Sequence, residues 1–533
     1  MIEIGNIRLG LDDKEKLLSK KAAAALGVEP SAIKKVKILK KSLDARRKSD
    51  IKKLYTLAVE VEGKEEKIIA RAGNKGAKAY EPLVYTIPKV ESDCRSVVVG
   101  FGPGGMFAAL ALAEAGLRPI VLERGWDVDS RHKAIERFWE TGEFSPQCNV
   151  QFGEGGAGTF SDGKLNTGTH DKRIAFVLET LHRFGAPEAV TYDAKPHVGT
   201  DVLRKVVKNI REEIIALGGE VRFATRFVGF EEENGALTAI KAEGENGEYT
   251  IPCHSAILAL GHSARDSFEY LHSKGLAMER KSFSMGVRIE HKQAAVGYAQ
   301  YGESYKKLPA ADYKLNCRFE EGDSAYTFCM CPGGYVVAAA GEEGGVVTNG
   351  MSYSGRAGEN ANAALLVSLT PEDFPGEGVL AGMYWQREIE QRAYNYGGGN
   401  YLAPAQKVGD FLAHRPSEGP GEVKPTYRPG VIWGDIRDVL PKKICHTLEK
   451  AIPELGKKLS FFNSADAVLT APETRSSSPV RLLRGENLES LSVKGIYPCG
   501  EGAGYAGGIT SAAVDGLRVA EMVIKASNSA KQA

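Results

Sequence analysis

A run of glycines after an apolar segment is the clearest chemical pattern in the chain. Residues 97–105 read Val-Val-Val-Gly-Phe-Gly-Pro-Gly-Gly, and an Ala/Leu-rich stretch follows them. A G-x-G-x-x-G pattern between a strand and a helix is typical of dinucleotide binding. Gly100 would permit the tight turn, Gly102 the approach of the backbone to a pyrophosphate, and Gly105 the close packing of helix on strand. The helix N-terminus would offer free N–H groups to phosphate. The loop also contains Phe101 and Pro103.

An acidic residue stands at the spacing that this kind of site requires. The apolar run Pro119–Leu122 ends at Glu123, 23 residues after Gly100, and Arg124 follows it as a further candidate for cofactor binding. A carboxylate at this position can accept hydrogen bonds from both ribose hydroxyls of an adenosine. The alternative is a glycine-rich turn that holds no ligand. The motif alone does not distinguish NAD from FAD.

Three segments together resemble the glutathione-reductase-type superfamily of FAD-binding proteins. The first is the glycine motif. Residues 256–261, Ala-Ile-Leu-Ala-Leu-Gly, resemble the "hhhATG" strand of that superfamily and include Ala259 and Gly261. Residues 496–502, Ile-Tyr-Pro-Cys-Gly-Glu-Gly, resemble its terminal "GD" motif. The resemblance implies a non-covalent FAD bound in a Rossmann-type domain.

The resemblance also assigns roles to single residues. Glu501, directly after Gly500, stands where the superfamily has an aspartate that binds the ribityl chain. Val228 lies on an expected strand that reaches the adenine in those proteins. Gly508 and Ile509 open the last helix, where backbone N–H groups would lie near the flavin N1–C2=O edge and stabilise negative charge on the reduced ring.

Four segments resemble a bacterial family of FAD-dependent dehydrogenases within this superfamily. They are residues 42–46, 155–165, 328–334 and 498–509, and the likeness extends over nearly the whole chain. It implies the cofactor and the architecture and leaves the substrate open. Only one dinucleotide fingerprint is present, so a second Rossmann domain for NADH or NADPH is not expected. Either nucleotide could still serve as an external electron donor.

A second glycine-rich stretch, residues 153–168, stands where related flavoproteins lay a loop along the pyrophosphate and the flavin ring. Lys164 could hold the pyrophosphate charge or a substrate anion, which also makes it a candidate for the chemistry. The alternative is a flexible surface loop. The other candidates for cofactor contact in this stretch are Thr159, Ser161, Asp162 and Gly163.

Cys329 and Cys331 could carry redox chemistry, because thiols that approach a flavin can form a charge-transfer or redox pair. The alternative is a structural role, since residues two apart on a strand share one face and a disulfide at this spacing is strained. His262 and Arg265 follow the strand that ends at Gly261, where they could contact a ligand or cap the structure. No general base can be assigned.

The composition bounds the class of protein. The 533 residues have a net charge of only +1, which suits a globular chain of several domains and argues against one dominated by phosphate binding. Eight cysteines without a Cys-x-x-Cys pair predict reduced thiols and no metal site. The first residues show no secretory signal, so we expect a cytoplasmic protein without a membrane span. The oligomeric state is not indicated.

The candidate residues need a parallel sheet to position them. Strands and helices alternate from residue 96 to residue 260, which predicts an α/β Rossmann-type FAD-binding domain. The expected elements are a helix at 201–217, strands at 221–230, 237–242, 248–251 and 255–260, and a final helix at 510–526. Residues 91–269 are predicted to form the first part of the FAD-binding domain, and residues 270–465 an inserted mixed α+β substrate domain. Residues 466–533 are predicted to complete the FAD-binding domain.

Residues 1–90 predict a separate small domain. Strands at 7–11, 36–45 and 54–61 with a helix at 14–26 indicate a ferredoxin-like α+β unit. Residues 34–53 hold ten Lys/Arg and two acids, a density that could bind RNA. Few aromatic residues accompany them, so a solvated basic face is the alternative.

These features favour a FAD-dependent oxidoreductase that passes hydride or electrons between FAD and an unidentified organic substrate. Two alternatives stay open. One is flavin-dependent modification of tRNA or another RNA through the basic N-terminal domain. The other is a non-enzymatic flavin-binding redox sensor or interaction protein.

Overall fold

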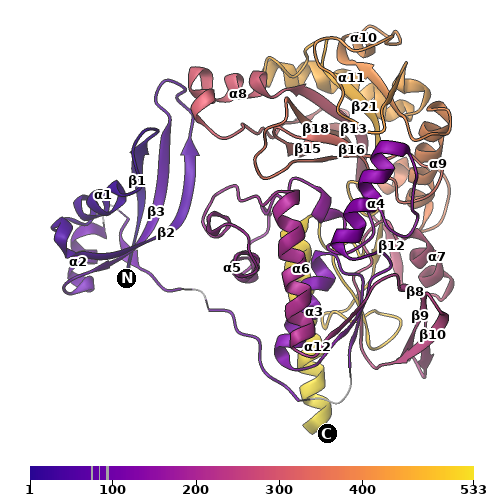
Figure 1. The fold of residues 1–533 in the computed structure, drawn as a ribbon, viewed down its shortest axis with the longest axis horizontal. Coiled ribbons are helices and arrows are strands. Elements are labelled where there is room, and N and C mark those ends of the chain that lie inside the picture. The colour runs from indigo at the N-terminus through magenta and orange to yellow at the C-terminus, as the bar shows by residue number, and fades with distance from the viewer. Residues whose placement is uncertain (74–75, 83, 92–94, 533) are drawn as a thin grey trace.

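The computed structural model describes residues 1–73, 76–82, 84–91 and 95–532. Figure 1 shows a small N-terminal unit to one side of two larger units that are stacked on each other. The lower unit contains a parallel sheet with long helices beside it, and the upper one contains a mixed sheet. None of the described helices combines the length and the apolar character needed to cross a lipid bilayer.

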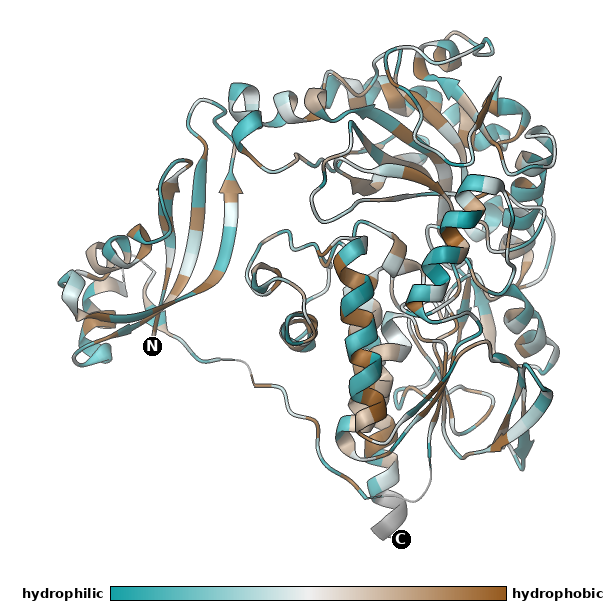
Figure 2. Cartoon of the chain, in the orientation of Figure 1, coloured by the Kyte–Doolittle hydropathy of each residue, from teal (hydrophilic) through white to brown (hydrophobic). Residues whose placement is uncertain are grey.

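The N-terminal unit is a four-stranded antiparallel sheet packed against two helices. The strands follow the order β2-β3-β1-β4, and the element order βαββαβ is that of the ferredoxin-like motif. Apolar residues alternate along β1, and Figure 2 shows the resulting brown and teal segments along the strands. The elements are β1 Ile2–Gly10, α1 Leu17–Leu26, β2 Ile33–Asp44, β3 Lys52–Val61, α2 Glu65–Ala72 and β4 Lys78–Ala79.

The dinucleotide-type unit has a five-stranded parallel sheet in the order β7-β6-β5-β11-β23. Numbered along the chain this order is 3-2-1-4-5, the Rossmann order. Its two switch-point neighbours are β5 and β11, so a ligand is expected beyond their carboxyl ends. The strands are β5 Val97–Val99, β6 Ile120–Leu122, β7 Glu220–Arg222, β11 Ala256–Leu258 and β23 Ile496–Pro498.

Each face of this sheet is covered by a different layer. Val98 and Val121 pack with the helices α3 Pro103–Ala115, α6 Thr200–Ala216 and α12 Ile509–Gln532, which lie side by side in Figure 1. Their neighbours Val97 and Ile120 pack on the other face, against a three-stranded sheet and the helix α7 Arg265–Ser273. The three strands are β8 Arg226–Glu233, β9 Ala236–Gly244 and β10 Gly247–Pro252. The remaining helices are α4 Val128–Thr141 and α5 Arg173–Arg183.

The strand predicted at 221–230 is two strands in two different sheets. β7 ends at Arg222 and β8 begins at Arg226, and Ala224 between them has φ +46°. The chain therefore turns sharply inside a stretch that reads as one β-rich run. The helix α2 has no counterpart among the predicted elements, because it presents only Ile68 and Ala72 to the core.

The inserted unit is built on a seven-stranded mixed sheet in the order β14-β15-β18-β13-β21-β19-β20. Its central strands β13 and β18 are buried along almost their whole length, and the buried residues of β13 include the charged Arg288 and Glu290. The strands are β13 Phe283–Lys292, β14 Asn316–Arg318, β15 Ser324–Cys331, β18 Asn360–Leu369, β19 Ala403–Lys407, β20 Val431–Trp433 and β21 Val468–Glu473. The helices are α8 Gln293–Tyr301, α9 Ala381–Tyr396, α10 Val408–Leu412 and α11 Lys442–Lys458.

Two antiparallel strands join the inserted unit to the parallel-sheet unit. They are β12 Met278–Arg280 and β22 Val480–Leu482, one on the way out and one on the way back. Because β21 belongs to the seven-stranded sheet, the predicted domain boundary at residue 465 is too early. A further pair, β16 Tyr335–Ala338 with β17 Thr348–Met351, completes the unit.

Candidate cofactor site

One cavity lies between the carboxyl edge of the parallel sheet and the inserted unit. Its volume is about 920 Å³, near the top of the range of roughly 300–1,000 Å³ for ligand pockets. It sits at the switch point between β5 and β11, where the Rossmann order predicts a ligand. Its lining comes from four parts of the chain: residues 99–195, 225–267, 312–356 and 473–512.

The glycine loop after β5 shows why its positions must lack side chains. Gly100 has φ +94°, and a Cβ there would lie 2.3 Å from the carbonyl oxygen of Ala259. A Cβ on Gly105 would lie 1.9 Å from the carbonyl oxygen of Gly100. The helix α3 begins at Pro103 and its N-cap, Gly102, offers no side-chain cap. The first N–H groups of α3 are therefore available to an anion in the cavity.

Glu123 is fixed by three backbone donors. Its Oε2 accepts a 2.9 Å hydrogen bond from the N–H of Phe101, and its Oε1 accepts 2.9 Å hydrogen bonds from the N–H groups of Gly125 and Gly153. The buried carboxylate thus ties three loops together while it lines the cavity. Arg124 beside it stacks 4.0 Å from the ring centre of Phe152.

Three glycines on the other side of the loop leave open space. Nothing lies within 4 Å of a Cβ built on Gly261, Gly500 or Gly508, and all three line the cavity. The helix α12 begins beside Gly508, so a second helix N-terminus faces the same space. The open space at these glycines can hold a flat ring, and the two helix N-termini can bind a diphosphate. The cavity therefore suits a long cofactor that has both parts. The residues present therefore fit FAD.

His262 and Glu501 are the cavity's proton-holding pair. His262 Nε2 lies 3.9 Å from Glu501 Oε1. Burial, together with the cations Arg475 and Arg265, lowers the pKa of His262 to about 3. Burial raises the pKa of Glu501 to about 7, although Lys281 opposes the shift. Near neutral pH the imidazole is therefore neutral and the carboxyl is close to half-protonated.

Most of the predicted cofactor residues line this cavity. They are Gly100, Phe101, Gly102, Pro103, Glu123, Arg124, Ser161, Lys164, Ala259, Gly261, Gly500, Glu501, Gly508 and Ile509. Of the weaker candidates for the chemistry, Cys329 and Lys164 line it, and Cys331 lies behind the wall and is fully buried. Lys164 Nζ donates to the carbonyl oxygen of Met330.

Five predicted residues do not line the cavity. Asp162 is buried in an ion pair with Arg356, whose Nε lies 3.0 Å from it, so its charge serves a neighbour that does line the cavity. Val228 does not line the cavity, whereas its neighbours Arg226 and Phe227 do; it bulges from β8, because the pairing with β9 passes from Phe227 to Gly229. The others, which support the loops behind the wall, are Gly105, Thr159 and Gly163.

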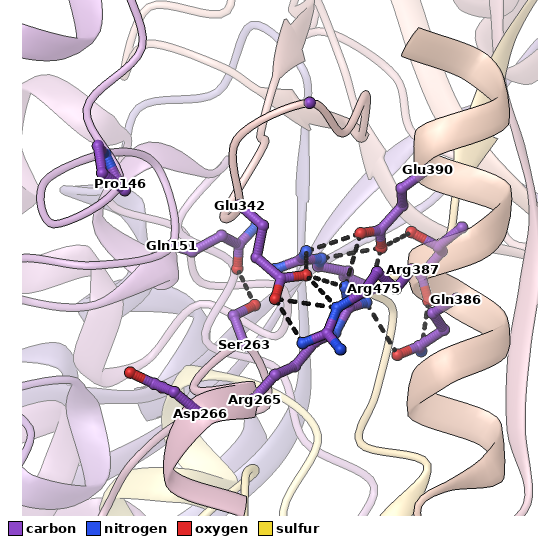
Figure 3. A network of polar contacts seen from close by, with 12 residues as sticks. Pro146, Gln151, Ser263, Arg265, Asp266, Glu342, Gln386, Arg387, Glu390 and Arg475 are labelled. Atoms are coloured by element: carbon purple, nitrogen blue, oxygen red, sulfur yellow. Dashed lines mark hydrogen bonds and ion pairs between the residues drawn. The ribbon is translucent and has the colours of Figure 1, made fainter. Parts of the chain in front are cut away.

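A buried ion cluster joins the two units beside the cavity, and Figure 3 shows its arginines pointing toward Glu342 and Glu390. Arg265 on α7 reaches both oxygens of Glu390 on α9 at 2.9 Å. Arg475, which lines the cavity, also binds Glu390 at 3.0 and 2.7 Å. Burial opposes ionisation, yet Arg265 and Arg475 hold the pKa of Glu390 well below its ordinary value.

Sequence patterns did not point to several wall residues. Gln151 and Phe152 directly precede the second glycine-rich stretch, so their position there could have marked them. Glu473 and Arg475 have no local signal, because their partners lie far away along the chain. Other residues of this kind are Ser263, Tyr313, Asn349, Arg356 and Tyr505.

The fold and the cavity define a Rossmann-type α/β flavoprotein. Residues 282–476 match the family described as "FAD-dependent protein, C-terminal domain-like", and residues 1–60 match a domain of unknown function, DUF8436. A Clostridium beijerinckii protein without a functional name is 48% identical over 532 residues, which cover 98% of each chain. The chain belongs to the same family as this relative. The predicted resemblance to a bacterial FAD-dependent flavoprotein family is confirmed.

Solved structures of flavoenzymes are similar at a lower level. A flavin-dependent brominase has a TM-score of 0.38 and 11% identity, with 82% of this chain and 81% of that chain covered. A geranylgeranyl bacteriochlorophyll reductase-like protein from Thermoplasma acidophilum has a TM-score of 0.36 and 14% identity, with 82% and 79% covered. At these scores neither likeness bears on the reaction of this chain.

Proposed function

We propose that this chain is an oxidoreductase that binds one FAD along the glycine side of the cavity and transfers hydride or electrons between it and an organic substrate. One observation carries the proposal. A single space is bordered on one side by glycine backbone and two helix N-termini, and on the other by charged and thiol side chains of the inserted unit. The first side suits a cofactor and the second suits a reacting partner.

The expected contacts of the cofactor follow from the wall. Glu123 would accept the ribose hydroxyls of the adenosine, and the N-terminus of α3 would bind the pyrophosphate. Gly500 and Glu501 would bind the ribityl chain, and the N-terminus of α12 would lie at the ring edge. When bound, FAD supplies the redox chemistry, and the chain supplies orientation, charge and a shielded space.

The mouth of the cavity favours an anionic substrate. Four cations line it: Lys164, Lys195, Lys314 and Arg356. Lys195 faces Asp312 at 2.7 Å and Arg356 is paired with Asp162, whereas Lys164 donates to a neutral carbonyl. The mouth therefore keeps net positive charge, which attracts carboxylates and phosphates.

An anaerobic absorption experiment tests the proposal. Purified protein should show the flavin spectrum, and FAD should be released on denaturation. NADH and then NADPH are added, followed by small anionic substrates if neither bleaches the flavin. Bleaching by a pyridine nucleotide would make the chain a nucleotide-linked reductase, and bleaching by an organic substrate would make it a dehydrogenase. A purified chain that neither carries nor binds FAD would contradict the proposal.

A second candidate, modification of RNA, draws support from the position of β2. The backbone of Lys41 on this strand bonds to Tyr192 O and to Ala194 N at 2.8 Å each, directly before Lys195 at the cavity mouth. A basic edge strand is thus held beside the entrance. Neutralising its exposed Lys35, Lys37 and Lys40 should abolish salt-sensitive tRNA binding, while the same change at Lys20 and Lys21 on α1 should not. Equal binding by both variants would remove this candidate.

A further inference from the structure

The inserted unit places a strained turn at the cavity wall. β15 pairs with β18 at Phe328 and Ala364 and again at Cys331 and Asn362, so one extra residue bulges from β15 between the two pairs. Cys329 in this bulge has φ +38°, a conformation that costs energy for a residue with a side chain. Bulges near reaction sites re-aim side chains. Here Cys329 lines the cavity and Cys331 is fully buried behind it.

A buried arginine holds the turn in place. Arg288 Nη2 donates to the carbonyl oxygen of Cys329 at 2.7 Å and lies 3.3 Å from Cys331 Sγ. Arg288 is held in turn by Glu473, at 3.0 and 3.2 Å, and by Asn362 at 2.8 Å. Cys331 Sγ also lies 3.2 Å from the carbonyl oxygen of Cys329, so the two residues share one network.

The surroundings shift the pKa values of the two thiols in opposite directions. The hydrogen bond from Cys331 lowers the pKa of Cys329 against burial, and the cations Arg288 and Lys164 add to the shift. Burial, and then the hydrogen bond to Cys329, raise the pKa of Cys331 well above its ordinary value. The nearby acids oppose a thiolate at Cys329. They are Asp162, paired with Arg356, Glu473, paired with Arg288, and Glu501.

We propose that Cys329 and Cys331 are a redox-active dithiol of the cavity, with Cys329 as the nucleophile and Cys331 as the resolving thiol, and that they act on disulfides. The Cys329 thiolate attacks one sulfur of a disulfide, the S–S bond breaks, and one thiolate leaves. Cys331 gives its proton to the thiolate that has left, attacks the Cys329 sulfur and expels the second thiolate, which takes up a proton from water. Two protein thiols are thereby oxidised to one disulfide as the substrate is reduced to two thiols.

This inference rests on the proposed function and deepens it, because FAD bound in the cavity would, in its reduced form, supply the two electrons that return the pair to thiols. The thiol chemistry itself can be read without the cofactor. Cys317 on the neighbouring strand β14 is the matched control, because it is also partly exposed, does not line the cavity, and has its pKa raised by burial.

The test treats the reduced protein, as purified, with a small excess of dithiodipyridine and follows thiopyridone release and protein mass. Wild type and Cys317→Ser should rapidly release two thiopyridones from this site and lose two hydrogens, with peptide mapping that links Cys329 to Cys331. Cys331→Ser should release one and keep a mixed disulfide on Cys329. Stable mixed disulfide on Cys329 in the wild type, or equal labelling of Cys317, would overturn the proposal.

Alkylation by iodoacetamide gives an independent reading in the same samples. At pH 7, Cys329 should react about tenfold faster than Cys317, because an ordinary thiol is only a few per cent thiolate there. The pH midpoint of the Cys329 reaction should rise in Cys331→Ala, which removes the hydrogen-bond donor at this position. A midpoint that Cys331→Ala leaves unchanged would contradict the assigned roles. Disulfide formation in a chain without flavin would support the dithiol while the proposed function fails, so the two failures are distinguishable.

Discussion

The two walls of the cavity are built by different means. The wall of the parallel-sheet unit consists largely of backbone: glycines, two helix N-termini and one carboxylate held by three N–H groups. The wall of the inserted unit consists of side chains that are held by buried ion pairs, with a strained residue at its centre. The first wall can bind one kind of cofactor whatever the reaction, whereas the second can vary its chemistry by changing side chains. We infer that the reaction is set by the inserted unit.

The largest expected effect comes from a glycine of the backbone wall. In Gly105→Ala the new methyl group would meet the carbonyl oxygen of Gly100 at 1.9 Å, so the loop must shift. We expect FAD binding to weaken on the order of 100-fold, measured by flavin fluorescence titration. Gly73→Ala is the control, because Gly73 does not line the cavity and nothing lies within 4 Å of a Cβ built there. Equal affinity in the two variants would contradict the packing role of Gly105.

The second-largest effect is expected from the ion cluster that joins the two walls. Glu390→Gln leaves the buried Arg265 and Arg475 with only the partly exposed Glu342 as a carboxylate partner, so we expect the free energy of unfolding in urea to fall by about 3 kcal/mol. Glu388→Gln on the same helix removes an exposed pair with Arg392 and should cost at most about 0.5 kcal/mol. Similar losses in both variants would show that the buried cluster does not clamp the units together.

Glu501 should make stability depend on pH in the FAD-free chain. The folded carboxyl keeps its proton up to about pH 7, while the unfolded chain releases it near the ordinary value of 4.5. The free energy of unfolding should therefore fall as pH rises through this window, by about 3 kcal/mol at most. Glu501→Gln should remove that fall, giving a variant that is more stable than wild type at pH 8 and similar at pH 4. Parallel curves for wild type and variant would refute the shift.

The smallest expected effect concerns Lys164, which crosses from one wall to the other. Its Nζ bonds to Met330 O, and its charge contributes less to the pKa of Cys329 than Cys331 or Arg288 does. Lys164→Gln should raise the pH midpoint of Cys329 alkylation by about half a unit. Lys195→Gln at the mouth is the control and should leave the midpoint in place. A larger shift of the midpoint in Lys195→Gln than in Lys164→Gln would mean that the net charge at the cavity mouth, and not the nearby Lys164, sets the pKa of the thiol.

The same contrast explains how far sequence reasoning could reach. The backbone wall depends on local patterns, so Gly100, Gly105 and Glu123 could be assigned roles from spacing alone. Val228 lies on a strand as predicted, β8, but it bulges from the ladder and does not line the cavity, and no local pattern signals that bulge. The strand predicted at 221–230 likewise hid a turn at Ala224, where nothing in the residue type signals a positive φ.

The second wall was largely out of reach. Arg288 and Glu473 are 185 positions apart, and Arg265 and Glu390 are 125 apart, so only the folded chain brings them together. The bulge at Cys329 arises from the pairing of β15 with β18, which leaves no trace in the Cys-Met-Cys spacing. The strand is therefore not regular at this point, although the two thiols still contact each other.

The crystal structure of the FAD-loaded chain tests the central claim most directly. The two-wall account predicts adenosine beside Glu123, pyrophosphate at the N-terminus of α3, and the flavin ring between Gly508 and the wall that carries Cys329. FAD bound outside this cavity, or a ring turned away from the inserted unit, would contradict the account.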